Sequence, residues 1–255
     1  MVNQLSLQEE DVVFPDADQL VTEDDTPVDS FASEKQQRLL ISSFFSSLKD
    51  RLPFIAAANV GIYYTDQQPA IVPDVFVSFG VQVPKNWWDK QNRCYLVWKF
   101  GKPPEIAIEV VSNKVGNELA NKLAIYERMR VSYYAVYDPR QQLSPSPLRL
   151  FELRGTQYSE MAQPWMAQVD LGLTLWEGDF EGSQNTWLRW QDAQGNLLLT
   201  GDEQAEQARE QVEQVREQAE QADQARVQVE QARERAARLA AYLRSQGIDP
   251  DQLPE

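Results

Sequence analysis

The sequence predicts an α/β protein, at the border with the α+β class, in which helices flank one mixed central β-sheet and a long helix follows. Apolar residues make up 42% of the 255 positions, which is enough to bury the core of one domain. One segment with helical periodicity lies between two strand-like segments, an order typical of a β-α-β crossover. Residues 202–244 contain neither glycine nor proline, which favours one continuous helix.

Charge divides the chain into parts. Residues 1–30 hold nine acids and no Lys or Arg, and residues 202–255 hold thirteen acids and seven Arg. Acids and bases balance in residues 31–201, so the formal charge of −15 belongs to the flanks. We therefore expect an acidic, disordered arm over 1–30 and a folded domain over 31–201. A long helix over 202–246 and a short tail over 247–255 complete the predicted organisation.

The lack of histidine and the presence of only one cysteine exclude several kinds of chemistry. The chain has no histidine, which excludes Ser-His-Asp and Cys-His catalysis and histidine-ligated zinc. Cys94 is the single cysteine, so the chain can form no internal disulfide and no cysteine-rich metal site. Any metal must bind to carboxylates and carbonyls, ligands that suit Mg²⁺, Mn²⁺ or Ca²⁺.

Nothing in the sequence indicates a membrane. No stretch of about 18 uncharged apolar residues is present. Residues 1–18 carry acids rather than the basic head and apolar run of a signal peptide. We therefore expect a soluble, cytoplasmic protein with no membrane partner.

The first half of the domain should contain one helix and two strands. Apolar residues at helical spacing predict a helix from Ser33 to Leu52, with Ser33 as its N-cap and Gln36 as the capping-box partner. Residues 59–64 and 70–79 are rich in β-branched and aromatic side chains and read as strands. Residues 84–104 then form a loop-like insertion.

The second half of the domain contains the crossover. Residues 105–111 predict a strand, residues 117–130 a helix, and residues 132–137 a second strand. Residues 148–153 and 157–161 predict a hairpin, because the Arg-Gly-Thr sequence between them is typical of a turn.

The C-terminal helix has a seam of small apolar residues. Ala, Val and Leu recur at a 3/4 spacing from Ala205 to Leu243, with one break, which predicts a coiled coil. Most seam positions are alanine, so each heptad would bury little area. The alternatives are a weak homodimer, packing back on the domain, and a solvated single helix held by i,i+4 ion pairs.

Two acids interrupt apolar strands. Asp74 lies within Ile71 to Val77, and Glu109 lies within Ile106 to Ser112. A buried acid is costly without a partner, so the alternative for Asp74 is an edge position that faces water. If the strands are neighbours, both carboxylates can converge on one hard cation, with the backbone carbonyl of Val110 as a third ligand. Such a cation polarises a phosphate and lowers the pKa of a bound water.

The crossover helix offers a cation for the same site. Lys122 and Tyr126 are four residues apart, so they share one helix face. Lys122 could point at the two acids and stabilise negative charge in a phosphoryl transition state. The alternative is a lysine that lays its stem along the apolar stripe and keeps its ammonium in water.

Taken in order, these segments resemble the PD-(D/E)xK phosphodiesterase superfamily, and more closely the Uma-two family of restriction-endonuclease-like proteins. The resemblance covers roughly residues 31–200. The matching stretches are Pro73-Asp74-Val75-Phe76-Val77-Ser78, Pro103 to Ser112, and Lys122 to Pro139. The resemblance implies a restriction-endonuclease-like fold, with Asp74 and Glu109 as ligands of Mg²⁺ or Mn²⁺.

The chain departs from the superfamily pattern at one position. The superfamily's lysine stands two residues after the second acid, where this chain has Val111. The resemblance therefore points to Lys122 on the next helix as the catalytic lysine, or to Lys114 in the loop before it. It also implies that Glu34, on the first helix, is an auxiliary acid.

The insertion combines basic and aromatic side chains. Its bases are Lys85, Lys90, Arg93, Lys99 and Lys102, and its aromatic residues include Trp87, Trp88, Tyr95 and Trp98. This mixture suits a phosphate backbone and unstacked bases, so these bases, with Lys114, are candidate DNA contacts. The alternative is that the tryptophans cover the sheet and the lysines are solvated.

The sequence is compatible with three functions. The leading hypothesis is a divalent-metal-dependent endonuclease that hydrolyses DNA phosphodiester bonds, with a homodimer placing two sites on opposite strands. The second is a catalytically inactive module that binds nucleic acid or assembles with a partner through its C-terminal helix. The third is a scaffold for protein interactions. The two acids inside apolar strands argue against it, because a scaffold does not need them.

Overall fold

The computed structural model describes residues 30–65, 68–88, 92–112, 118–247 and 249. The chain divides into two compact units at the bond between Thr200 and Gly201. The acidic arm expected over residues 1–30 lies outside the described residues, except for Ser30.

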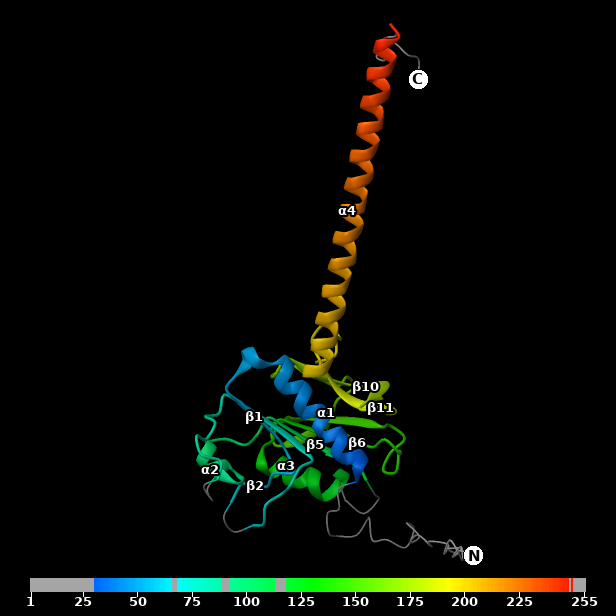
Figure 1. Ribbon diagram of the computed structural model, residues 1–255. Coiled ribbons are helices and arrows are strands. Elements are labelled where there is room, and N and C mark those ends of the chain that lie inside the picture. Colours follow the sequence, from blue (N-terminus) through cyan, green and yellow to red (C-terminus); the bar gives the residue numbers. More distant parts are fainter. Residues whose placement is uncertain (1–29, 66–67, 89–91, 113–117, 248, 250–255) are drawn as a thin grey trace, which may run out of the picture. The chain divides into compact units, whose positions relative to one another are not determined.

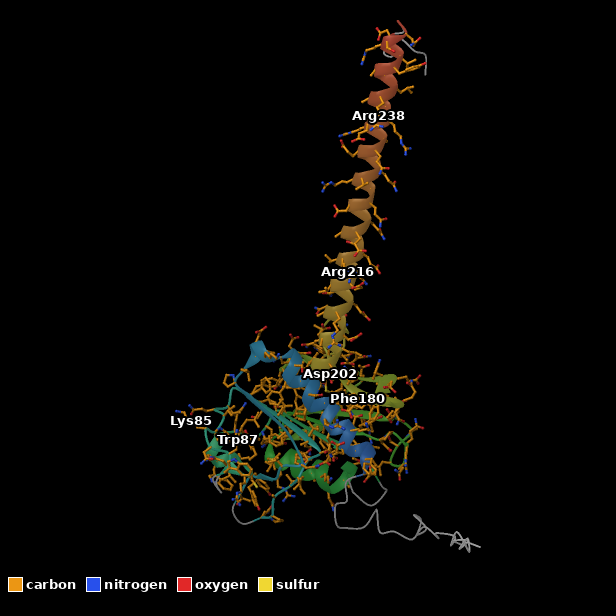
Figure 2. The ribbon with its side chains drawn as sticks, in the orientation of Figure 1. Lys85, Trp87, Phe180, Asp202, Arg216 and Arg238 are labelled. Atoms are coloured by element: carbon orange, nitrogen blue, oxygen red, sulfur yellow. The ribbon has the colours of Figure 1, made fainter. Side chains whose placement is uncertain are left out.

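The second unit begins with the single long helix α4 (Gly201–Ser245), as the sequence predicts (Figure 1). None of its side chains is buried, and seam residues such as Val212 and Val215 are largely exposed. Ion pairs along the helix follow the i,i+3 and i,i+4 spacings, as for Arg216, which Figure 2 labels and which lies 3.0 Å from Glu220. The predicted coiled coil stays a prediction. Within the described ranges, no helix is both long and apolar enough to cross a bilayer.

A six-stranded sheet forms the centre of the first unit (Figure 1). Its strands, in spatial order, are β1 (Phe54–Ala58), β3 (Val75–Phe79), β5 (Ile106–Val110), β6 (Tyr133–Tyr137), β7 (Leu148–Arg154) and β8 (Gln157–Glu160). All neighbours are antiparallel except β5 and β6, which are parallel. The mixed α/β class and the hairpin of β7 and β8 are therefore confirmed.

The parallel pair is joined by the predicted crossover. A π-helical turn over Glu118–Lys122 continues into α3 (Leu123–Met129), and the chain then returns as β6. The residues Tyr126 and Met129 are buried on the sheet side of α3. This crossover brings Lys122 and Tyr126 over β5, the strand that contains Glu109.

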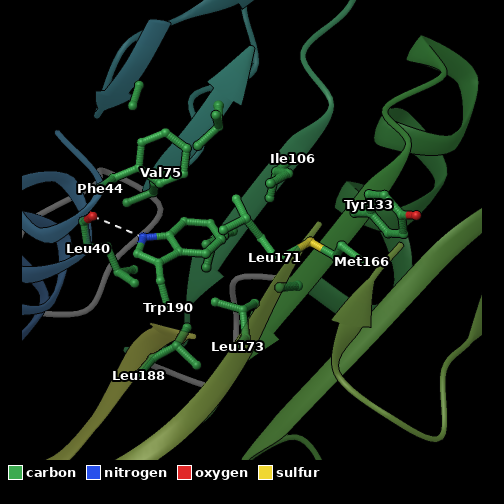
Figure 3. Packing of buried hydrophobic residues seen from close by; sticks show 14 of the residues in the cluster. Leu40, Phe44, Val75, Ile106, Tyr133, Met166, Leu171, Leu173, Leu188 and Trp190 are labelled. Carbon is green, nitrogen blue, oxygen red and sulfur yellow. Dashed lines mark hydrogen bonds between the residues drawn. The ribbon is translucent and has the colours of Figure 1, made fainter. Parts of the chain in front are cut away.

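One face of the sheet is covered by α1 (Phe31–Ser47) and by a second sheet of β9 (Trp165–Met166), β10 (Leu171–Phe180) and β11 (Ser183–Gln191). Figure 3 shows this core, in which Trp190 packs between α1 and the two sheets. The Trp190 indole donates to the Leu40 carbonyl at 3.0 Å. The strands of this second sheet are missing from the sequence prediction.

The predicted start of the first helix is wrong. Ser30 is the N-cap of α1, and its Oγ accepts from the Ser33 amide at 3.1 Å. Gln36 is buried and does not cap the helix. Its Nε2 donates to the Leu188 carbonyl at 2.8 Å, and its Oε1 accepts from the Leu188 amide at 2.9 Å. Because β11 is an edge strand, its free backbone groups need such a partner, which explains the buried glutamine.

The opposite face carries α3, β2 (Ile62–Tyr63), β4 (Tyr95–Leu96) and α2 (Val97–Phe100). Two predicted strands are therefore shifted. The strand expected over 59–64 is mostly replaced by β1 before it, and the strand expected over 70–79 begins only at Val75. Asn59 has a positive φ of 54°, and Pro73 lacks a backbone donor, so neither position extends a strand ladder.

Candidate active site

Asp74 stands immediately before β3, beside the end of β5. The antiparallel register pairs Val75 with Ile108, so Asp74 faces Glu109 on the neighbouring strand. Its Oδ2 accepts from the Val110 amide at 2.7 Å, and its Oδ1 accepts from Gln37 Nε2 at 2.7 Å. Both carboxylate oxygens are therefore fixed in direction, while the side chain keeps part of its surface exposed.

Glu109 is the buried member of the pair, with 1% of its side chain exposed. Its Oε1 accepts from the Tyr126 hydroxyl at 2.7 Å. Its Oε2 accepts from Lys122 Nζ at 2.8 Å, and the Lys122 side chain stays 29% exposed. The structure thus brings together Asp74, Glu109, Lys122 and Tyr126, four of the residues that the sequence singles out.

The two carboxyl groups are electrostatically strained. Burial raises the pKa of Glu109 to about 8, against the opposing effect of Lys122 and with a further increase from Asp74. Burial also raises the pKa of Asp74, which the Val110 amide and Lys122 counteract. The pKa of Tyr126 lies well above its usual value because the phenol is buried beside Glu109. At both carboxyl groups, burial therefore outweighs the opposing effect of the single ammonium group.

Asp74 and Glu109 are the site residues that could bind a hard divalent cation. Within the described residues, no three or more acid, histidine or cysteine side chains gather, so a cation here would have two carboxylate ligands. Mg²⁺ is commonly bound in this way, with water and substrate oxygens completing its shell. The N–H and C=O groups of one strand residue point to the same side, so the Val110 carbonyl faces the Asp74 side of β5.

Gln37 is the site residue that the sequence analysis missed. It is 3% exposed on α1, donates to Asp74, and its Oε1 accepts from Asn59 Nδ2 at 2.8 Å. A signal for it existed, because Gln36 and Gln37 precede Leu40 by about one turn and so extend the apolar stripe of the helix. Two polar residues on such a stripe indicate specific partners.

Glu34 does not join this group in the structure. It is exposed on α1 and binds Arg38 Nε at 2.8 Å, and Arg38 also pairs with Glu181. The Arg38 guanidinium lowers the pKa of Glu34, as is usual for a solvated ion pair. The expectation of an auxiliary acid at the carboxyl pair is not supported, because the first helix contacts Asp74 through Gln37 instead.

Val111 is buried in the apolar cluster on the α3 side of the sheet. The position that holds the superfamily's lysine is therefore apolar here, and an ammonium group reaches Glu109 from the next helix instead.

The predicted DNA-contacting bases have different surroundings. Lys85, Arg93 and Lys99 are exposed, and Lys99 binds Asn92 Oδ1. Lys102 is half-buried and forms an ion pair with Glu105. Lys90 and Lys114 lie outside the described residues.

An open cavity of about 510 Å³ adjoins the end of β5. Its lining combines Val110, Val111 and Ser112 with polar residues of the α1 N-terminus and β11 and with Arg140. The strand end that holds Val110 therefore borders on solvent-filled space lined by hydroxyl, amide and guanidinium groups.

These features define a mixed α/β domain with a buried carboxyl pair at the end of its central strands. The Uma2 family model, described as "Putative restriction endonuclease", matches residues 19–181. This match covers more than half of the chain, and the protein belongs to the Uma2 family.

Comparison with solved structures gives matches to part of the chain. A crystal structure from Anabaena variabilis, described as a "putative nuclease belonging to DUF820", is 15% identical in sequence with a TM-score of 0.40. The match covers 55% of this chain and 72% of that one. Comparison with curated proteins gives no significant match.

Proposed function

We propose that this protein is a divalent-metal-dependent endonuclease that hydrolyses DNA phosphodiester bonds. The observation that supports the proposal most is the position of two acids next to each other, Asp74 just before β3 and Glu109 on β5. Lys122, which is partly exposed, forms an ion pair with the buried Glu109. Membership of a family of restriction-endonuclease-like proteins is consistent with this chemistry.

The chain's own residues would hold and orient the site. Asp74, Glu109 and the Val110 carbonyl would bind Mg²⁺ or Mn²⁺, which supplies a Lewis acid for the phosphate and lowers the pKa of water. Gln37 and the Val110 amide keep the Asp74 carboxylate in one orientation. Tyr126 does the same for Glu109, so little reorganisation is needed when substrate binds.

Lys122 would act on the substrate side of the site. Its ammonium lies 2.8 Å from Glu109 and remains partly exposed, so it can reach a phosphate oxygen that enters from solvent. Fixed positive charge near that oxygen stabilises the charge that develops on the phosphoryl group during attack by water.

DNA is the partner that the surface supports. Residues 31–201 have balanced charge, so this part of the chain carries no net negative charge that would repel phosphates. Lys85, Arg93 and Lys99 are exposed cations that could contact the backbone. A homodimer through α4 would bring two such sites to one duplex.

The second candidate is an inactive nuclease-fold module that binds nucleic acid or a partner. The buried Val111, at the position of the superfamily's lysine, favours it. In that case Lys122 serves only to neutralise Glu109, and the site needs no metal.

A cleavage assay on the full chain separates the two candidates. Supercoiled plasmid and single-stranded DNA are incubated with Mn²⁺ or Mg²⁺, with Asp74→Asn and Glu109→Gln beside the wild type. Glu34→Gln is the matched control, because Glu34 is an acid in an exposed ion pair. We expect metal-dependent cleavage that both site variants lower by at least about 100-fold and the control leaves unchanged. Absence of cleavage by the wild type, or equal cleavage by all variants, contradicts the proposal.

A further inference from the structure

A second cavity, of about 440 Å³, lies beside the edge strand β1. Its volume is in the range of small-ligand sites. Most of its lining is aromatic or aliphatic, from Phe45, Leu52, Phe54, Ile55, Ala56, Ala57, Val60, Phe76, Val83, Trp87, Tyr95 and Phe100, and the rest is Asn92, Arg93 and Cys94. We call this space the aromatic cavity.

The wall of the aromatic cavity is a fixed set of rings. Tyr95 and Phe100 stack with centroids 4.4 Å apart and an angle of 15°, and Phe76 meets Tyr95 edge-on at 5.3 Å. The Tyr95 hydroxyl donates to the Lys102 carbonyl at 3.0 Å and shares a hydrogen bond with Ser78. The rings are therefore held in place before any ligand arrives, a property that favours a flat apolar ligand.

Exposed cations lie near Trp87, an exposed residue of the cavity lining. Trp87 is 49% exposed, and Arg93 is an exposed lining residue. Lys85 lies two residues before Trp87, and both lie beside α2 on one side of the domain (Figure 2). A neutral apolar ligand makes no use of these cations, whereas a flat ring attached to a phosphate matches both the lining and the cations.

The aromatic cavity lies around the β1 edge of the sheet, and part of its wall lies on the sheet face that carries Glu109. Phe76, in the cavity wall, pairs with Ala107 on β5. Glu109 follows Ala107 by two residues and therefore points to the same face, about 7 Å further along the strand. We therefore expect a DNA strand that has one phosphate at the carboxyl pair to extend toward the cavity wall formed by Phe76.

We propose that the aromatic cavity binds one nucleobase of the DNA strand, unstacked from its neighbours, next to the phosphate at the carboxyl pair. This inference rests on the proposed function and names where the substrate's base lies. The amide of Asn92 is engaged by Asn86 and Lys99, so few polar groups remain to distinguish the bases. The cavity therefore binds a base by stacking and tolerates any of the four.

The test compares two adjacent tryptophans. Binding of a fluorescein-labelled single-stranded oligonucleotide to the full chain is measured by anisotropy in EDTA, so that neither metal nor cleavage is involved. Trp87→Ala removes a cavity residue, whereas Trp88→Ala removes a side chain that is 85% exposed and outside the lining. We expect Trp87→Ala to weaken binding roughly 5-fold or more, and Trp88→Ala and Trp87→Phe to keep most of it.

A second measurement uses the wild type alone and so does not depend on the folding of a variant. An oligonucleotide with one 2-aminopurine reports stacking on the aromatic rings by a change in fluorescence. Unlabelled oligonucleotides of different sequence should compete equally, and one with several abasic positions should compete several-fold more weakly.

The possible outcomes test the nucleobase site and the proposed nuclease activity independently. Equal binding by the wild type, Trp87→Ala and Trp88→Ala, with no fluorescence change, overturns the nucleobase site while cleavage decides the proposed function independently. Loss of binding in Trp87→Ala, together with absence of cleavage by the wild type, supports the cavity within a catalytically inactive module. Failure of the wild type to bind any oligonucleotide overturns the inference, and with absent cleavage it overturns the proposed function as well.

Discussion

Two groups of acids in this protein have basic partners and yet differ in charge state. Glu34 and Glu181 lie on the surface with Arg38, and their pKa values are lowered. Glu109 has Lys122 at a similar distance, but burial raises its pKa to about 8. The comparison teaches that desolvation, rather than the presence of an ion pair, distinguishes the two groups. Burial therefore favours the protonated form of Glu109 and Asp74, whereas the surface acids favour the ionised form.

The largest expected effect concerns the adjacent glutamines of α1. Gln37→Ala removes the donor to Asp74, and we expect the affinity for Mn²⁺ to fall by about 10- to 100-fold, as for other residues that orient a ligand. Gln36→Ala removes the contact with β11, so it should lower stability and leave metal affinity unchanged. Calorimetric titration and urea unfolding of both variants test this difference. Equal metal affinities would contradict the role assigned to Gln37.

The fold and the site differ in how far the sequence predicts them. The crossover around α3 follows from periodicity, and the hairpin of β7 and β8 follows from the turn residues between its strands. The alternation of Leu171, Leu173 and Leu175 indicates a strand as well, but Gly172 and Gly178 weaken the pattern of β10. Asp74 and Glu109 stand out because they interrupt apolar strands. The role of Gln37 depends on how α1 packs over the start of β3, and no local pattern contains that information.

We expect an intermediate effect on stability when the cations Lys122 and Arg38 are replaced. Lys122→Met removes the hydrogen bond that the Lys122 ammonium donates to Glu109. We expect a loss of about 1 to 2 kcal/mol, less than for a fully buried ion pair, because Lys122 is partly solvated and the raised pKa of Glu109 leaves little negative charge on it at pH 7. Arg38→Met removes exposed ion pairs and should change stability less. Urea unfolding at pH 7 in EDTA measures both, and a larger loss in Arg38→Met would contradict the comparison.

The smallest expected effect, counted per pH unit, is a change of the unfolding free energy with pH. Glu109 has a folded pKa of about 8 against 4.5 for an ordinary glutamate, so the folded state binds more protons between these values. The unfolding free energy of the metal-free protein should therefore decrease as the pH rises from 5 to 8, by at most about 1.4 kcal/mol per pH unit. Surface acids with lowered pKa values act the other way, and only below pH 4.5.

The pH series is checked by urea unfolding at pH 5, 6, 7 and 8 in EDTA. Glu109→Gln should flatten the decrease, because glutamine does not titrate, and Glu34→Gln should leave it as it is. A wild-type stability that rises steadily over this range would contradict the environment assigned to Glu109.

We propose that Asp74 and Glu109 together bind one divalent cation. The most direct test is a calorimetric titration of the full chain with Mn²⁺ at pH 7.5, with Asp74→Asn, Glu109→Gln and the surface control Glu34→Gln. We predict binding by the wild type and the control, and loss of binding in both site variants. Binding that survives in Asp74→Asn and Glu109→Gln, or no binding by the wild type with DNA present, would contradict the claim.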